Sequence, residues 1–188
     1  MPTKLTELTW DASVLPAAQA PGTRVALFTF KTHLAGFVWD AAQLENNPYT
    51  FVEVKTLLDG VTVGGHKVSD TEQVLNLAES SKNLIELVQT GRFVLDKKTF
   101  PLLHGIIARN EALEWGVFRG AGEELHYNAR VHLGELGTHF PPATEAGAPE
   151  LNRIFAEGVS HIKALPPFEC GLSMFLFGAS FPSFFSGN

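Results

Sequence analysis

Apolar residues recur along most of this chain at the spacing of amphipathic helices. Residues 24–45 carry a dense set of apolar side chains with no proline, which favours a helix, although the stretch 25–30 also suits a strand by β-propensity. Further apolar stripes predict helices over residues 50–60, 69–91, 97–110, 149–164 and 168–177.

Local start signals accompany these stripes. Thr50 with Glu53, and Ser69 with Glu72, have the spacing of a capping box, in which each side chain bonds the other residue's backbone N–H. Asp96 is expected to cap the helix that follows it. These signals predict where three of the helices begin.

Glycine and proline interrupt the helical pattern in two places. Residues 61–65 read as a tight turn, because a phosphate-binding glycine loop would follow a strand and carry a lysine. Residues 113–148 leave room only for short strands, which predicts a hairpin or a long functional loop. Residues 1–23 show no sustained periodicity and read as an irregular arm. The prediction is an all-α fold with one small β-hairpin.

Composition excludes several classes of protein. The 188 residues are 45% apolar and 18% charged, which is typical of a globular domain. The net charge is −6 and no basic run is present, so no nucleic-acid partner is expected. The single Cys170 cannot form an internal disulfide and no signal-peptide core is seen, so a cytoplasmic location is expected. The apolar run 172–185 is too interrupted for a membrane span.

Candidate chemical groups do not define a reaction. The spacing of His126, His132 and His139 fits no metal-binding pattern, and loop histidines are mostly polar surface. His104 is expected to be a hydrogen-bonded core or edge group. Cys170 lies on an apolar helix, which favours packing over nucleophilic chemistry. No metal site is predicted.

Two segments nevertheless resemble motifs of the Fic family. Residues 41–50 read AAQLENNPYT. They resemble the inhibitory motif of Fic proteins, which is Ser or Thr, three residues of any kind, Glu, and then Gly or Asn. Glu45 and Asn46 keep their places in this motif, whereas Ala41 stands where the family has Ser or Thr.

The second segment is the C-terminal end of the sequence. Residues 168–179 and 184–188 resemble the helix that leads into the Fic signature, in which His, Phe, an acid, Gly and Asn have fixed places. Phe184, Gly187 and Asn188 match nucleotide-binding positions of that signature, while Pro182 stands at the histidine position and Ser186 at the acid position.

A third set of residues resembles the two ends of the family's flap, the hairpin that aligns a target segment beside the nucleotide. Gly116, Phe118 and Arg119 form one end and Phe140 belongs to the other.

The resemblance implies a single Fic-like domain over residues 1–188. It comprises the arm 1–23, an inhibitory helix 24–47 bearing Glu45 and Asn46, and a core 48–188 with its flap near 116–142. The family's enzymes are protein adenylyltransferases (AMPylation), which use ATP and Mg²⁺ to transfer AMP to a Ser, Thr or Tyr hydroxyl of a protein. In the family, the glutamate at the place of Glu45 pairs with a signature arginine. This sequence does not contain that arginine, so Glu45 could inhibit only if residues outside the sequence supplied it.

Activity is expected to be impaired, because Pro182 cannot accept a proton and Ser186 is no carboxylate for Mg²⁺. The sequence also ends before the signature's arginines. The alternative function is a non-catalytic protein-interaction module. A third reading is a helical domain with accidental similarity, which the absence of a flap hairpin would favour.

The aromatic residues of the C-terminal segment suggest an interface. Five phenylalanines are expected to be exposed there: Phe175, Phe177, Phe181, Phe184 and Phe185. Such a patch predicts a partner, most simply a second copy of the chain, in addition to any protein substrate.

Overall fold

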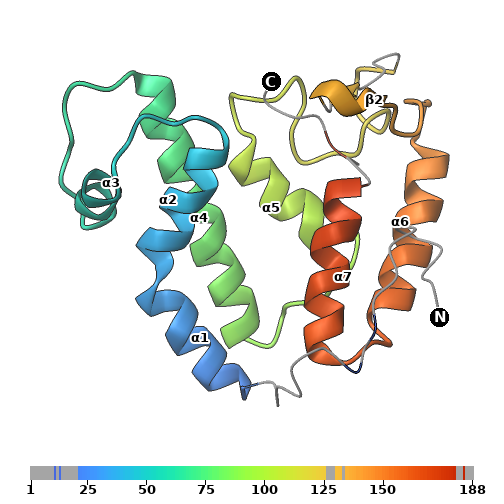
Figure 1. Cartoon of the computed structure of the whole chain (residues 1–188), viewed down its shortest axis with the longest axis horizontal. Helices are drawn as coiled ribbons and strands as arrows, with labels where there is room; N and C mark the ends of the chain where they lie inside the picture. The colour runs from blue at the N-terminus through green and yellow to red at the C-terminus, as the bar shows by residue number, and fades with distance from the viewer. Residues whose placement is uncertain are drawn as a thin grey trace. The chain divides into compact units, whose positions relative to one another are not determined.

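A computed structural model describes residues 11, 13, 21–125, 130–132, 134–180 and 184 of the chain. Within them lie seven α-helices and one two-stranded antiparallel sheet (Figure 1), which confirms an all-α fold with a small hairpin. The chain forms two compact units. The first consists mainly of Pro21–Val94 and Lys98–Gly116, and the second mainly of Leu95–Lys97 and Val117–Phe185. Most of the predicted arm lies outside the described residues.

The first unit begins with two helices in place of the single helix predicted over 24–47. These are α1, Thr23–Thr32, and α2, Leu34–Leu44. His33 interrupts them with φ −103° and ψ 11°, and its Nδ1 lies 2.9 Å from the Thr29 carbonyl oxygen. Thr32 Oγ1 also donates to the Phe28 carbonyl, a bond that bends helices. The prediction of one unbroken helix was therefore wrong, and so was the strand alternative for 25–30.

The capping box predicted before α3, Phe51–Leu58, is confirmed. Thr50 Oγ1 accepts from the Glu53 backbone N–H at 3.3 Å, and Glu53 Oε2 accepts from the Thr50 N–H at 2.8 Å. These two bonds satisfy backbone donors that the first helical turn would otherwise leave unpaired.

The next helix, α4, covers Val68–Gln89 and begins earlier than predicted. Its N-cap is Lys67, whose backbone N–H donates to Asp70 Oδ2 at 3.3 Å. The predicted pair of Ser69 and Glu72 was wrong, because the carboxylate of Asp70 reaches back to an N–H two residues ahead of Ser69. Ser69 is therefore inside the first turn.

Helix α5, Thr99–Ile107, has Lys98 at its N-cap position in place of the predicted Asp96, and the Lys98 side chain makes no capping bond. Beginning at Thr99 places Pro101 in the first helical turn, where a missing N–H removes no intrahelical bond. Among the described residues of the first unit, the apolar core joins α2, α3 and α4. Its buried members are Val38, Ala42, Tyr49, Val54, Val74 and Ala78.

The second unit contains the predicted hairpin and two helices. Strand β1, Val131–His132, pairs antiparallel with β2, Thr138–His139, and the turn between them includes a 3-10 helix at Gly134–Leu136. Helix α6, Pro149–Ile162, begins at a proline as predicted, and α7 covers Pro167–Ser180. Across the part of the chain that is described, no helix has the length and apolarity that crossing a bilayer requires.

Candidate functional site

The C-terminal end of α2 places Glu45 and Asn46 at a left-handed turn. Asn46 has φ 58°, and its N–H donates to the Gln43 carbonyl at 3.0 Å. The Asn47 N–H donates to the Ala42 carbonyl at 3.0 Å, which completes a Schellman motif. Gly and Asn enter this region of φ more readily than other residues, so the asparagine at position 46 suits the backbone of this turn.

Glu45 is the C-cap residue of α2, and its side chain is exposed. Ala41 is half-buried one turn earlier, four residues from Glu45 on the same face of the helix. The structure thus presents the Glu45 carboxylate to solvent from the first unit, on a turn of defined backbone conformation.

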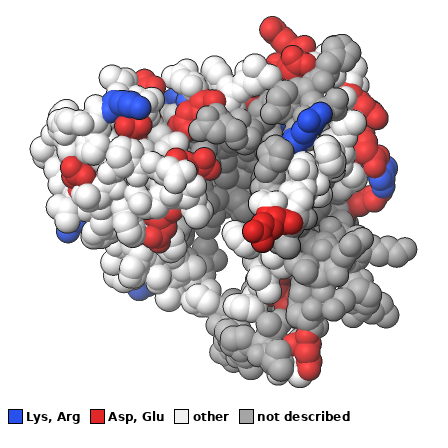
Figure 2. All heavy atoms as spheres, turned by 45° about the horizontal axis from the view of Figure 1, so that its top comes forward, with Lys and Arg blue, Asp and Glu red and all other residues white. Residues whose placement is uncertain are grey.

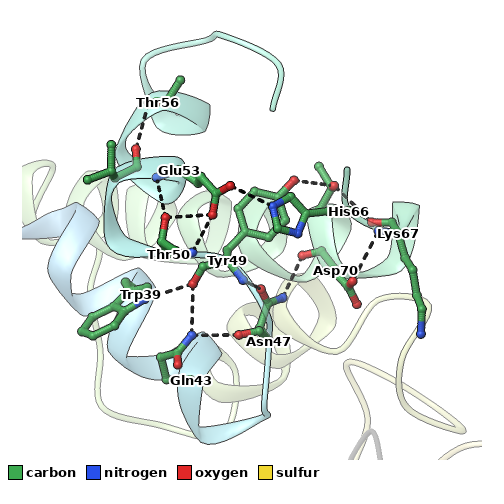
Figure 3. Close-up of polar contacts among 12 residues, drawn as sticks. Trp39, Gln43, Asn47, Tyr49, Thr50, Glu53, Thr56, His66, Lys67 and Asp70 are labelled. Carbon is green, nitrogen blue, oxygen red and sulfur yellow. Dashed lines mark hydrogen bonds and ion pairs between the residues drawn. The ribbon is translucent and has the colours of Figure 1, made fainter. Parts of the chain in front are cut away.

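The residues that follow Glu45 are held by a network of polar contacts (Figure 3). Asn47 is 5% exposed, and its Nδ2 donates to the Asp70 carbonyl at 2.9 Å and to Gln73 Oε1 at 2.8 Å. Its Oδ1 accepts from the Tyr49 N–H at 3.0 Å. The side-chain amide of Asn47 is therefore paired at both donors and at its acceptor.

Helix α2 contributes two further donors to this segment. Gln43 Nε2 donates to the carbonyls of Asn47 and Tyr49 at 2.8 and 3.1 Å, and Trp39 Nε1 donates to the Tyr49 carbonyl at 3.1 Å. Tyr49 is 1% exposed, and its hydroxyl shares a 2.7 Å hydrogen bond with Thr71 Oγ1. Side chains from α2 and α4 thus fix the segment from both directions.

His66 links this network to the start of α3. Its ring stacks on Tyr49 with centroids 3.8 Å apart, and its Nε2 lies 3.2 Å from Glu53 Oε1. Hydrogen bonds from Thr50, first through its backbone N–H and then through its hydroxyl, lower the pKa of Glu53 to about 2, with a smaller contribution from His66. Glu53 is therefore anionic beside the imidazole at neutral pH.

Gly116, which the sequence predicts to be at one end of a flap, belongs to the first unit. It has φ 74°, and its N–H donates to His104 Nδ1 at 3.1 Å. A Cβ at Gly116 would lie 3.3 Å from the Gly105 Cα, so the close approach of the two glycines leaves little room for a side chain. The prediction that His104 is a hydrogen-bonded group is confirmed.

The other residues predicted to form the flap lie in the second unit, where Arg119 is 0% exposed. Its NH1 donates to Thr144 Oγ1 and its NH2 to the Pro142 carbonyl, both at 3.0 Å. The Gly147 N–H donates to the Gly120 carbonyl at 2.7 Å. A Cβ at Gly120, which has φ 84°, would collide with the Glu145 carbonyl. These hydrogen bonds and this close backbone approach hold residues 119–120 against residues 142–147.

Phe118, next to Arg119 in the chain, is part of an aromatic cluster. It is 1% exposed and packs edge-on against Phe155 and Phe184, with centroids 5.2 and 4.9 Å apart, while Lys97 Nζ lies 5.1 Å from its ring centroid. Phe140, by contrast, is 66% exposed. Phe118 is therefore a core residue of the second unit, and Phe140 presents an apolar ring to solvent.

The signature positions are only partly described. Phe184 is half-buried against Phe118, whereas Pro182, Ser186, Gly187 and Asn188 lie outside the described residues. Their assignment to the signature stays a prediction from sequence.

The expected exposure of the C-terminal phenylalanines is partly wrong. Phe175 is 73% exposed, but Phe177 is 1% exposed because Gly158 of α6 leaves space for its ring. Phe181 and Phe185 lie outside the described residues.

Among the described residues, His132, His139 and Cys170 lie on three different elements. His139 is exposed on β2, His132 belongs to β1, and His126 lies outside the described residues. No group of three or more His, Cys, Asp or Glu suited to a metal ion is found within the described ranges. Cys170 is half-buried on α7.

Sequence reasoning missed Asn47, Tyr49 and His66. One signal was available for Asn47, because an asparagine two residues ahead of Tyr49 and next to Pro48 suits a turn in which its side chain accepts a backbone N–H. The contacts of Tyr49 with Thr71 and His66 are tertiary, and no local pattern indicates them.

Figure 2 shows the charged residues on one face of the molecule. The Lys and Arg side chains visible there stand apart from one another, with Asp and Glu between them. The described residues on that face form no extended basic patch.

Comparison with known proteins supports the fold of the chain. No family model matches its sequence, and no curated protein matches it. Among solved structures, it is similar to the crystal structure of a Fic family protein from Desulfovibrio desulfuricans G20, with a TM-score of 0.56 and 16% identity. The match covers 90% of this chain and 54% of that protein, so the chain spans about half of its length. The chain therefore has a Fic-like fold.

Proposed function

We propose that the chain is a Fic-type domain related to enzymes that transfer AMP from ATP to a protein Ser, Thr or Tyr hydroxyl, and that its own transfer activity is impaired. The observation that carries the proposal is the end of α2, where Glu45 and Asn46 match the inhibitory motif in sequence and Asn46 has φ 58°. The Fic-like fold and the hairpin between residues 131 and 139 support it.

The signature positions explain why transfer should be weak. In the family the histidine takes the proton of the target hydroxyl, and a base of this kind contributes roughly 10²- to 10⁴-fold to a rate. Pro182 has no side-chain acceptor. Ser186 is neutral, so it does not fit the carboxylate role that Mg²⁺ favours. ATP is the substrate expected from the resemblance.

Glu45 would act as the regulatory group of this domain. Its carboxylate is exposed on a turn whose neighbours are fixed by Asn47 and Tyr49. In the family the corresponding glutamate pairs with a signature arginine and disturbs the γ-phosphate of ATP. That arginine follows the Gly and Asn that match Gly187 and Asn188 here.

Labelling with ATP radioactive at the α-phosphate tests the proposal. The wild-type chain with Mg²⁺ should incorporate little AMP into itself or into lysate proteins. In a chain extended past Asn188 by Gly-Arg, which supplies a signature arginine, Pro182→His combined with Ser186→Asp should raise incorporation at least tenfold, a lower bound on what a base supplies. Asn83→Ala, which replaces a half-buried residue of α4, is the control variant. Absence of both ATP binding and labelling in every variant would overturn the proposal.

A non-catalytic interaction module is the second candidate, and the exposed face of α7 favours it. Phe168 and Phe175 are 46% and 73% exposed and lie seven residues apart on the face that also carries Gly171 and Gly178. Apolar helix faces of this kind mark protein contacts. If a second copy covers this face, sedimentation velocity should show a dimer that Phe175→Ser dissociates. A monomer at low micromolar concentration would count against it.

A further inference from the structure

Asn47 is buried two residues beyond Glu45, and all of its hydrogen-bonding groups have partners. Its side-chain amide donates twice to α4, through the Asp70 carbonyl and Gln73 Oε1, and accepts from the Tyr49 N–H. Its backbone N–H donates to Ala42 and its carbonyl accepts from Gln43 Nε2. A fully paired buried amide of this kind strongly specifies one local conformation.

The apolar core packs α2 against α4, and the bonds of Asn47 add a polar link at the end of α2, of which Figure 3 shows the contact with Asp70. Only Asn46 separates Glu45 from Asn47, and Asn46 is restricted to the left-handed conformation of the Schellman motif. Glu45 therefore has little backbone freedom while Asn47 is bound to α4. The network continues through Gln73, whose Nε2 donates to Glu111 Oε2 at 2.9 Å, and so reaches the segment after α5.

We propose that Asn47 is a positioning residue for Glu45, which it holds in place by tying the end of α2 to the first turns of α4. The proposal rests on the proposed function for the regulatory role of Glu45. Separation of Asn47 from Asp70 and Gln73 is then the step that frees Glu45 to move. Tyr49 assists through its single hydroxyl contact with Thr71, so its contribution is smaller.

Amide hydrogen exchange measured by NMR tests the positioning directly. Asn47→Ala removes both donors to α4 and should speed exchange of the residue 46 and 47 amides roughly 10- to 100-fold. The amide of Ile85, which is buried in the C-terminal part of α4, serves as the reference for unfolding of the first unit. Tyr49→Phe should have a smaller effect at the same two amides. Asn83→Ala removes a comparable amide bond to the Glu79 carbonyl and should leave them unchanged.

Coupling to Glu45 separates positioning from general stability. The ATP measurement uses a chain extended past Asn188 by Gly-Arg, which supplies the signature arginine that Glu45 is expected to pair with. In this chain the ATP affinity should rise in Glu45→Ala and in Asn47→Ala, and the double variant should equal Glu45→Ala within about twofold, because residues in one network are not additive. A purely structural role for Asn47 would give the same change in affinity whether or not Glu45 is present.

Three results have distinct meanings. Unchanged exchange at residues 46 and 47 in Asn47→Ala, or acceleration no greater than at Ile85, would overturn the positioning role. Additive effects on ATP affinity would overturn the claim that Asn47 acts through Glu45. If Glu45→Ala leaves ATP binding unchanged, or no variant binds ATP, the proposed function fails while the exchange measurement still decides the positioning by Asn47.

Discussion

Gly158 of α6 and Phe177 of α7 lie so close that a Cβ added to Gly158 would be 2.6 Å from Phe177 Cζ. The two helices therefore meet where a glycine faces an aromatic ring. Phe177 is 1% exposed as a result, although its neighbour Phe175 is 73% exposed. The contact defines which face of α7 belongs to the core of the second unit.

Gly158→Ala should lower the free energy of unfolding by about 1–3 kcal/mol, because an overpacked core side chain forces its neighbours out of position. Gly171→Ala is the matched control, since nothing lies within 4 Å of a Cβ at that exposed helical position. The control should be neutral or stabilising by up to about 1 kcal/mol through helix propensity. Urea unfolding followed by circular dichroism measures the free energy of unfolding of both variants. If Gly158→Ala and Gly171→Ala changed it equally, the close contact between Gly158 and Phe177 would be contradicted.

Asn46→Ala should lower the free energy of unfolding by about 1 kcal/mol, because alanine is strained at φ 58°. Asn46→Gly should change it by only a few tenths of a kcal/mol. The comparison of the two variants in urea isolates the backbone requirement. Equal stability of the alanine and glycine variants would show that the left-handed conformation is not required.

Arg119→Met should lower the free energy of unfolding by about 1–3 kcal/mol, because the Pro142 carbonyl and Thr144 hydroxyl lose buried donors. Thr144→Val removes one of these bonds and should have a smaller effect. Arg92→Met, at an exposed ion pair with Glu86, should change stability by about 0–1 kcal/mol. Thermal unfolding of the three variants should follow this order, and a neutral Arg119→Met would contradict the tie.

Glu53→Gln should lower stability in a pH-dependent way. The pKa of Glu53 falls from 4.5 to about 2 on folding, so the ionised carboxylate stabilises the native state above pH 4.5, and this contribution is lost as the pH falls towards 2. The difference between wild type and variant in urea midpoint should therefore be largest near neutral pH and shrink in acid. A difference that does not vary with pH would exclude this linkage.

Local signals predicted much of the fold. Thr50 and Glu53 bond each other across three residues, and Pro149 starts α6 because its missing N–H and fixed φ suit the first helical position. The glycine-rich stretch predicted the hairpin because left-handed residues such as Gly134 and Gly137 lie in its turn. In each case the cause lies within a few residues of the effect.

The features that the sequence did not indicate depend on contacts between distant segments. The burial of Phe177 requires Gly158 of another helix, and the role of Asn47 requires Asp70 and Gln73 of α4. His33 was missed for a different reason. A single residue with ψ near 0° divides α1 from α2 without any proline or glycine at that place.

The tie between Arg119 and residues 142–144 closes the two ends of the segment that carries the hairpin. A loop whose ends are already joined adds little entropic cost when it grows, roughly 0.6 kcal/mol for each doubling of its length. We therefore expect residues 121–140, which precede the buried Pro141, to tolerate changes of length and sequence while the helices of the second unit keep their packing. This segment should therefore be replaceable as a unit. Hairpins from other proteins could be grafted between Gly120 and Pro141, and the second unit would then present a different binding surface.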